Sequence, residues 1–378
     1  MSTAPDILMV ADPRFAGGTS SALIADVEAF VAAGASVGLM PVRSAFLDDM
    51  GEAWHPGVRA LLDHATVREI APGAVTAGTA FLHHPAIFYR GTRERAAISA
   101  RQSVLVAHQT PFRGDGSIEY DPVATTRQIR RAFGTRPLWA PISGVCRAQL
   151  ACFAPLIRLT GEDWYNVFDT DAWVAGREAL SDDTITIGRH GRPDRLKWPD
   201  TAAEVARSLP PAPGRRIRVM GLPEAHLDDM GVDMQHWDVV PFGAEPVRDF
   251  LDSLDVFVFH HHPMWVETFG RVVAEALLMG RVCVLDPAMR PSFGDVAAFA
   301  TPAETPALLD RIAADRPTWA ARAAEGRAAA IARYATTTVA ERHRRLATDR
   351  GTLSRAAADR PWSTVMRKLI GHLRRGRR

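Results

Sequence analysis

Short apolar segments alternate along this chain with longer stretches that have helical spacing, and this alternation limits the fold more than any other feature. The segments lack the polar alternation of a half-exposed strand, which is typical of parallel strands covered by helices on both faces. Ten such segments predict two doubly wound parallel α/β sheets. They span residues 6–11, 36–42, 79–84, 103–109 and 137–143 in the first half, and 184–188, 216–221, 238–242, 256–261 and 282–286 in the second.

An acidic segment that is poor in strand pattern, residues 161–183, separates the two groups of strands. We therefore predict a Rossmann-like N-terminal domain over residues 1–165, a hinge over 166–182, a Rossmann-like C-terminal domain over 183–345 and a helical basic tail over 346–378. Ligands of open α/β sheets bind beyond the carboxyl ends of the strands. We expect the two sheets to face each other across a cleft, with functional residues directly after strands.

Charge and cysteine content exclude several classes of protein. The 45 basic and 43 acidic residues leave a net charge of +2, so no electrostatic argument favours a nucleic-acid partner. Apolar residues make up 47% of the chain, which excludes general disorder. Cys146, Cys152 and Cys283 are too few and scattered for a disulfide framework. With no signal peptide pattern and no apolar run of about 18 residues, we expect a soluble cytoplasmic protein.

The strongest local signal is the segment HHHPMWVETFGRVVAEALLMG, residues 260–280. Its ETFG sequence, residues 267–270, leads from an apolar strand into a predicted helix, whose first amides favour a phosphate group. Glu275 lies among apolar neighbours, where a carboxylate needs hydrogen-bond donors. At helical rise Glu267 precedes it by about 12 Å, roughly the reach from the sugar to the ribose of a nucleotide sugar. The segment therefore predicts a sugar contact, a diphosphate cradle and a ribose contact in that order.

The two glutamates around this motif, with the glycine and valine that follow, resemble the signature of the GT-B glycosyltransferases of family four. Three other segments resemble that family in the same order along the chain. TIGRHGRPDRLKWP, residues 186–199, is similar to its G-R…K motif. ADPRFAGGTSSAL, residues 11–23, is similar to its glycine-rich loop, and VAHQTPF, residues 106–112, to its strand-ending histidine.

The resemblance implies a GT-B fold and an NDP-sugar-dependent transferase of the hexosyltransferase type that retains anomeric configuration and needs neither metal nor cofactor. Charge develops on the leaving diphosphate as the anomeric bond breaks, and cations aimed at that oxygen stabilise the transition state. By residue, it implies catalytic roles for Arg189, Lys197, Glu267 and His108, and donor-binding roles for Gly17, Gly18, Thr268, Phe269, Gly270 and Glu275.

The chain also departs from the family pattern. Arg189 and Lys197 are eight residues apart, and PAMRPSFGD, residues 287–295, stands where the family has a glycine pair with a glutamate. The resemblance therefore leaves the donor base and sugar open. Surface polysaccharide assembly, with a glycan or lipid-linked acceptor, is implied by resemblance to a bacterial branch of the family.

Other clusters of polar residues could suggest metal binding, which their positions do not favour. Consecutive histidines at a strand end, residues 260–262, point in alternating directions and do not converge on one metal ion. Asp169 and Asp171 lie in the predicted hinge, where helix capping or surface charge explains them better than metal binding. His83 and His84 end another strand, and either touch an acceptor or pack in the core.

The tail segment STVMRKLIGHLRRGRR, residues 363–378, predicts an amphipathic basic helix. Such a helix either lies on an anionic membrane surface, making the protein peripheral on the inner face of the membrane, or packs back onto the N-terminal domain.

Two other functions fit the same architecture. One is a sugar-nucleotide epimerase, which would release the nucleotide without an acceptor and would need a base that the sequence does not identify. The other is a non-catalytic nucleotide-sugar-binding component of a polysaccharide assembly complex.

Overall fold

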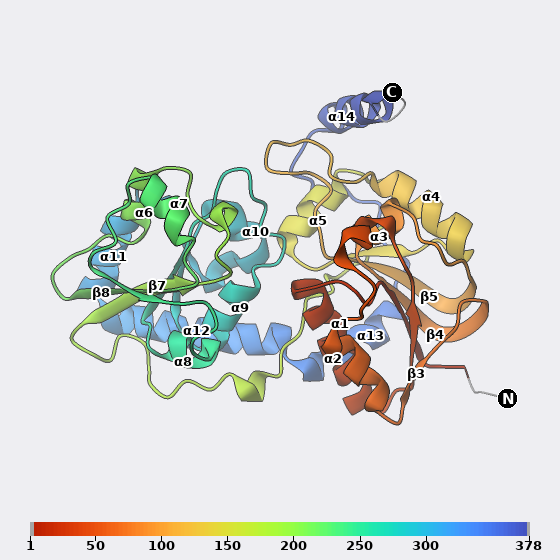
Figure 1. The fold of residues 1–378 in the computed structure, drawn as a ribbon, viewed down its shortest axis with the longest axis horizontal. Helices are drawn as coiled ribbons and strands as arrows, with labels where there is room; N and C mark the ends of the chain where they lie inside the picture. The colour runs from red at the N-terminus through yellow and green to blue at the C-terminus, as the bar shows by residue number, and fades with distance from the viewer. Residues whose placement is uncertain (1–3, 376–378) are drawn as a thin grey trace. The chain divides into compact units, whose positions relative to one another are not determined.

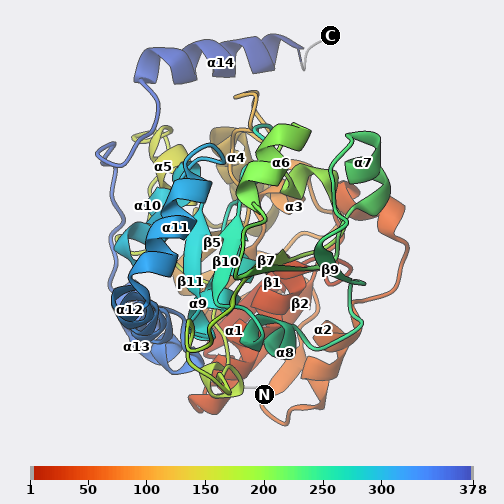
Figure 2. The ribbon, with the colours of Figure 1, turned by 90° about the vertical axis from the view of Figure 1, so that its left-hand side faces the viewer.

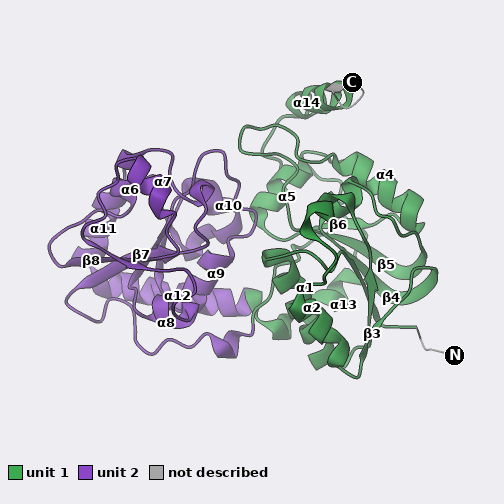
Figure 3. Ribbon diagram, in the orientation of Figure 1, with its two compact units in different colours: residues 1–168, 334–378 green, residues 169–333 purple. Residues whose placement is uncertain are grey.

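A computed structural model describes residues 4–375 of the chain. It divides into two compact units (Figure 3): unit 1 is formed by residues 1–168 and 334–378, and unit 2 by residues 169–333. Residues 334–345, predicted as the end of the C-terminal domain, thus belong to unit 1. There Val339 is fully buried, and the His343 ring lies 2.9 Å from the Thr79 hydroxyl.

Unit 1 contains a six-stranded sheet with the strand order β3-β2-β1-β4-β5-β6, and every neighbouring pair is parallel (Figure 1). The strands are β1 (Ile7–Ala11), β2 (Val37–Pro41), β3 (Val67–Glu69), β4 (Ala74–His83), β5 (Ala97–Ala107) and β6 (Leu138–Pro141). The longest pair is β4 and β5, whose register places His83 opposite Val106. The ends of these two strands therefore bring residues 83–84 and 106–108 together.

Unit 2 contains a second parallel sheet, with the strand order β12-β11-β10-β7-β8-β9. The strands are β7 (Ile185–His190), β8 (Arg215–Met220), β9 (Trp237–Val240), β10 (Val256–Phe259), β11 (Val282–Leu285) and β12 (Ala298–Phe299). The predicted class, two doubly wound parallel α/β sheets, is confirmed.

All ten predicted strands are present, and β3 and β12 are additional. These two are edge strands of three and two residues. An edge strand this short contributes too few apolar residues to form a recognisable run.

Helices connect the strands in both units. Unit 1 has α1 (Gly18–Ala32), α2 (Pro56–Ala60), α3 (Pro85–Tyr89), α4 (Pro122–Phe133), α5 (Gly144–Ala151), α13 (Val339–Leu346) and α14 (Trp362–Arg375), with short 3₁₀ turns η1 (Ala45–Met50), η2 (Leu61–Asp63) and η7 (Thr336–Thr338). Unit 2 has α6 (Ala202–Ser208), α7 (Glu224–Asp229), α8 (Val247–Asp252), α9 (Arg271–Leu278), α10 (Arg290–Phe293) and α11 (Thr305–Ala314), with turns η3 (Thr170–Ala172), η4 (Arg195–Lys197), η5 (Pro287–Met289) and η6 (Gly294–Val296). The long helix α12 (Arg316–Tyr334) ends where the chain enters unit 1 again. Figure 2 shows α6 and α11 beside each other on unit 2.

The helix boundaries follow local sequence signals. Asp121 accepts hydrogen bonds from the amides of Val123 and Ala124 at the start of α4, and Gly134 ends that helix in a left-handed conformation. Thr201 and Glu204 form a capping box at the start of α6.

The predicted tail helix is α14, and it packs on unit 1. Val365 and Leu369 are buried in the unit 1 core, whereas Ile370 and Leu373 are 46% and 49% exposed. The Lys368 ammonium donates to the Gly116 carbonyl at 2.5 Å, and the His372 ring lies 2.7 Å from the Tyr89 hydroxyl. Residues 376–378 of the predicted tail lie outside the described residues. Within residues 4–375, no helix is both long and apolar enough to cross a membrane.

Candidate functional site

The carboxyl edge of the unit 2 sheet gathers three of the predicted site residues. Arg189 is the penultimate residue of β7, Lys197 ends η4 in the loop after that strand, and Glu267 lies in the loop between β10 and α9. The Lys197 ammonium lies 2.6 Å from Glu267 Oε2, and Arg189 Nη2 donates to the Lys197 carbonyl at 2.5 Å. Two loops that follow neighbouring strands therefore place two cations and one carboxylate together.

Arg189 is buried between aromatic rings. Its guanidinium lies 4.3 Å from the ring centre of Trp198 and 4.6 Å from that of Phe259, and Nη1 donates to the His260 carbonyl at 2.8 Å. Burial lowers the pKa of Arg189 to about 9, which still leaves it charged at neutral pH. Arg189 therefore fixes the backbone of both loops and supplies positive charge beneath the more exposed Lys197.

Glu267 stays ionised although it is buried. Burial alone would raise its pKa, but the ion pair with Lys197 and hydrogen bonds from Lys197 and Trp265 together bring the pKa below its usual value. Glu267 Oε1 also accepts from the Gly270 amide at 3.2 Å. One of the three amides predicted to cradle a phosphate is thus bound to the carboxylate in this structure.

Gly270 caps α9 with a φ of 80°, a conformation that favours glycine. A Cβ at this position would lie 3.0 Å from Met289 and 3.1 Å from Phe293, so the turn also needs the absence of a side chain. The side chain of Phe269 is buried, and both Thr268 and Phe269 have interaction partners. Because α9 begins only at Arg271, the helical spacing assumed for Glu267 does not apply to the loop that carries it.

Glu275 occupies a second carboxylate site, with partners of its own. Its Oε1 accepts from Arg271 Nε at 2.9 Å, and its Oε2 lies 3.4 Å from His190 Nε2 without the geometry of a hydrogen bond. Burial raises the pKa of Glu275 to about 7 and lowers that of His190 to about 3. The printed hydrogen bond of Glu275 comes from Arg271, one turn earlier on α9, and not from Arg189 or Lys197.

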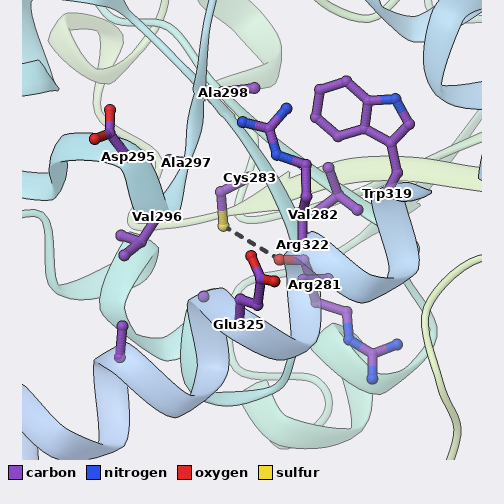
Figure 4. A pocket seen from close by; sticks show the side chains of 13 residues that line it. Arg281, Val282, Cys283, Asp295, Val296, Ala297, Ala298, Trp319, Arg322 and Glu325 are labelled. Atoms are coloured by element: carbon purple, nitrogen blue, oxygen red, sulfur yellow. Dashed lines mark hydrogen bonds between the residues drawn. The ribbon is translucent and has the colours of Figure 1, made fainter.

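Two hollows of unit 2 lie at opposite edges of the sheet. An open hollow of about 670 Å³ lies between the loops after β7 and β8, lined by Arg192, Arg195, Pro223 and His226 among others, on the same edge as Lys197. A smaller pocket of about 270 Å³, lined by Arg281, Cys283 and Trp319 among others, lies at the start of β11 (Figure 4). Ligands of such sheets bind at the carboxyl edge, and of these two hollows the first lies at that edge.

The loop after β1 in unit 1 carries Gly17 and Gly18. Gly17 has a φ of 89°, and a Cβ on either glycine would meet no described atom within 4 Å. The same loop contains a buried ion pair that the sequence analysis missed: Arg14 Nη2 lies 2.7 Å from Asp12 Oδ2 and also donates to the Ser44 carbonyl. An aspartate two residues from an arginine directly after a strand is the sequence signal that could have indicated it.

Three histidines meet at the carboxyl ends of β4 and β5. His83 Nδ1 lies 3.1 Å from His108 Nε2, and the ring centres of His84 and His108 are 6.2 Å apart and nearly parallel. Phe15 packs against His84 at 4.6 Å. Burial lowers the pKa of all three, to about 3 for His84 and His108, so the cluster is neutral. The structure thus brings His108 together with His83 and His84, and Lys197 with Arg189 and Glu267.

The remaining polar clusters have separate partners. The His260 ring contacts Ser208 and the Ala300 carbonyl, whereas the His262 ring contacts Asp200. Asp169 Oδ1 accepts from the Asp171 amide at the start of η3. Among residues 4–375, no group of three or more His, Cys, Asp and Glu side chains is placed to hold a metal ion.

Comparisons with known proteins bear on the fold. The chain matches no protein-family model, and no curated protein sequence matches it. Among solved structures, Anabaena HepE in complex with UDP has a TM-score of 0.61 at 16% identity, and the match covers 90% of this chain and 98% of HepE. HepE in complex with UDP-glucose has a TM-score of 0.58 at 16% identity, covering 89% and 98%.

AviGT4, a glycosyltransferase involved in avilamycin A biosynthesis, has a TM-score of 0.52 at 17% identity, and the match covers 90% of this chain and 96% of AviGT4. Identities this low establish the fold alone. The chain therefore has the two-unit α/β fold found in HepE and in the glycosyltransferase AviGT4.

Proposed function

We propose that this protein is a glycosyltransferase that takes its sugar from a nucleotide-sugar donor bound at the carboxyl edge of the unit 2 sheet. The observation that carries the proposal is the assembly of Arg189, Lys197 and Glu267 at that edge. The fold supports it, because HepE, which shares this fold, has been solved in complex with UDP-glucose.

The chemistry follows from the charges. Lys197 is held by one carboxylate, and a donor diphosphate would compete for it with two negative charges. Transfer of Lys197 to the diphosphate would free Glu267 to accept hydrogen bonds from sugar hydroxyls. As the anomeric C–O bond breaks, its electron pair goes to the diphosphate oxygen. The acceptor hydroxyl oxygen forms the new bond to the anomeric carbon, and its proton goes to the departing diphosphate. One preorganised hydrogen-bond donor to the diphosphate oxygen is worth about 3–4 kcal/mol.

Arg189 and Lys197 supply the positive charge that a divalent cation provides at other diphosphate sites. We therefore propose that transfer is metal-independent, so activity should persist in excess EDTA. Retention of anomeric configuration and a hexosyl donor rest on the family resemblance. The anomeric coupling constant of the product, read by NMR, tests retention.

The setting that we propose is surface polysaccharide assembly, on a glycan or lipid-linked acceptor. The described part of α14 supports a membrane surface as partner, because Ile370 and Leu373 are exposed beside the exposed cations Arg367 and Arg374. An apolar pair flanked by cations suits anionic lipid.

The direct test is a thermal-shift panel of UDP-, GDP- and ADP-sugars, since a ligand that binds the native state raises Tm. We expect one nucleotide series to raise Tm for wild-type protein and to have little effect on Lys197→Ala. Arg207→Ala is the matched control, because Arg207 is an exposed cation of α6 that does not line this hollow. No shift with any series would contradict the proposal.

Product analysis then separates transfer from the two alternatives. Labelled sugar that appears on an added acceptor supports a transferase. Nucleotide release with epimerised sugar and no acceptor would indicate an epimerase, and binding without turnover would indicate a binding component.

A further inference from the structure

In the three-histidine cluster of unit 1, one buried ring is placed to position another. We propose that His83 locks the His108 ring into a single tautomer and orientation, and so fixes which hydrogen-bonding role His108 Nδ1 offers to a saccharide oxygen. The proposal rests on the transferase function for the identity of the ligand, but the lock itself is a property of the unliganded protein.

The first argument is the geometry between the rings. His83 Nδ1 and His108 Nε2 are 3.1 Å apart, a hydrogen-bond distance for two ring nitrogens. Burial disfavours charging either ring, and the neighbouring histidines disfavour it further for His83. A pair of neutral imidazoles that shares one hydrogen bond carries one proton between the two nitrogens. The two rings must therefore adopt matched tautomers, both protonated at Nδ1 or both at Nε2.

The second argument is the burial of His83. Its side chain is fully buried, and its Nε2 is buried with no hydrogen-bond partner among the described residues. A change of tautomer in His83 would have to add or remove a proton at this nitrogen, where no protein group can deliver it. His83 therefore keeps the tautomer it has in the folded protein, and the shared hydrogen bond imposes the matching tautomer on His108.

The third argument is the backbone at His84. His84 has a φ of 72°, a left-handed conformation that is uncommon for residues other than glycine. Consecutive strand residues point to opposite faces, yet both the His83 ring and the His84 ring lie within 6.2 Å of the His108 ring. The turn at His84 brings its ring alongside His108, where it restricts the ring plane. Such conformations persist where surrounding structure holds them, often at functional sites.

His108 is the member of the cluster that can meet a ligand. It is half-buried, whereas His83 and His84 are buried, and it directly follows β5 at the carboxyl edge. With Nε2 engaged by His83, the remaining ring nitrogen, Nδ1, is either a fixed donor or a fixed acceptor. A sugar hydroxyl can accept a hydrogen bond from Nδ1 or donate one to it, but each role needs a different orientation of the O–H group.

The test reads the tautomer directly. Long-range ¹H–¹⁵N spectra of uniformly labelled protein distinguish protonated from unprotonated ring nitrogens, and the His83→Phe and His108→Phe spectra assign the signals. We expect wild-type His108 to show one protonated and one unprotonated nitrogen, with scalar coupling between His83 Nδ1 and His108 Nε2. Nitrogen shifts averaged between two tautomers would overturn the proposal.

Three variants separate positioning from packing. His83→Phe fills the same space without the hydrogen bond, and His108 should then show averaged tautomers. His83→Asn places an amide where Nδ1 was, and should restore a hydrogen bond to His108 Nε2 that holds the ring orientation. His84→Phe removes the neighbouring ring without touching the hydrogen bond, and should keep the single tautomer. Loss of the single tautomer in His84→Phe but not in His83→Phe would contradict the assignment.

Kinetics provide the functional readout. His83→Phe should lower kcat by up to about tenfold, the value of one hydrogen bond, with the donor KM and the UDP Kd changed less than twofold. His83→Asn should recover most of this loss, and Tm values establish that each variant is folded. Full kcat in a folded His83→Phe would overturn the positioning role. If the enzyme transfers no sugar but the spectra show the locked tautomer, the proposed function fails and the inference about the cluster stands.

Discussion

The two units share a strand order but differ in the chemistry of the edges where ligands of such folds bind. Read from the first strand of each, both sheets have the order 3-2-1-4-5-6. At the carboxyl edge of unit 2, Arg189, Lys197 and Glu267 keep their charges close together. At the corresponding edge of unit 1, burial keeps three histidines neutral beside Phe15 and Phe46.

Under the proposed function, this difference would match each edge to a different part of the substrate. Paired cations with a movable carboxylate suit a diphosphate, which carries charge before and after the bond breaks. Neutral imidazoles and aromatic rings suit an uncharged, hydroxyl-bearing group. One strand order thus provides two edges of different polarity, and under the proposed function substitutions at each edge should affect different steps.

The largest effect should come from Lys197→Ala. Loss of the direct cation should reduce turnover by about 10²–10³-fold, equivalent to about 3–4 kcal/mol, and weaken UDP binding. Steady-state kinetics and calorimetric titration with UDP measure the two effects. Arg207→Ala should stay within about threefold of wild type, because this exposed cation of α6 does not line the hollow at the carboxyl edge. Equal losses in both variants would mean that the unit 2 edge acts only through its net charge.

Glu275 should make the stability of unit 2 depend on pH. Its folded pKa of about 7 lies above the ordinary value of 4.5, so the native state binds the proton more tightly than the unfolded state. Its contribution is therefore fully present below pH 4.5 and is lost as pH rises to about 7, by up to about 3 kcal/mol. Glu275→Gln should remove this dependence, so its urea midpoint should exceed that of wild type near pH 8 more than at pH 4.5. Parallel pH curves would contradict the burial of an ionisable Glu275.

His108→Ala tests the carboxyl edge of unit 1. It removes a neutral ring from unit 1, so turnover should fall about tenfold, the value of one hydrogen bond, while the UDP Kd stays within twofold of wild type. The same calorimetric titration used for Lys197→Ala measures it. Weakened UDP binding in this variant would contradict the assignment of the diphosphate to the unit 2 edge.

The smallest effect concerns the exposed face of α14. The double variant Ile370→Ser and Leu373→Ser removes two exposed apolar side chains and keeps Val365 and Leu369 in the core. Sedimentation with anionic vesicles should fall about threefold while Tm is unchanged. Neutral vesicles serve as the lipid control. Unchanged sedimentation would exclude a membrane role for this face.

The fold could be predicted from the sequence because apolar runs report burial on both faces of a strand, and every predicted strand is present. The edge strands β3 and β12 were not predicted, because three and two residues are too few to show a pattern of apolar residues. The predicted end of the C-terminal domain at residue 345 differs from the unit boundary, because long-range contacts such as His343 with Thr79 place residues 334–345 in unit 1.

The site could be predicted in part. The family resemblance selected Arg189, Lys197, Glu267 and Glu275, and the shared carboxyl edge of parallel strands explains why the first three meet. Which amide Glu267 binds, and that Glu275 pairs with Arg271, depend on local conformations that no motif encodes. The left-handed turn at His84 reverses the strand alternation expected of His83 and His84, and a histidine at such a turn gives no sequence signal. The roles assigned to the individual site residues stay predictions.

The return of the chain at residue 334 sets an order for biosynthesis. Unit 2 is one continuous stretch, so it can complete its contacts while later residues are still being made. Unit 1 needs both ends: Arg342 donates to the Tyr165 carbonyl and lies over the Trp164 ring, and Val365 fills its core. Domains fold as their chains emerge from the ribosome. A nascent chain stopped before residue 334 therefore carries all the strands of both sheets, but its unit 1 still lacks α13 and α14.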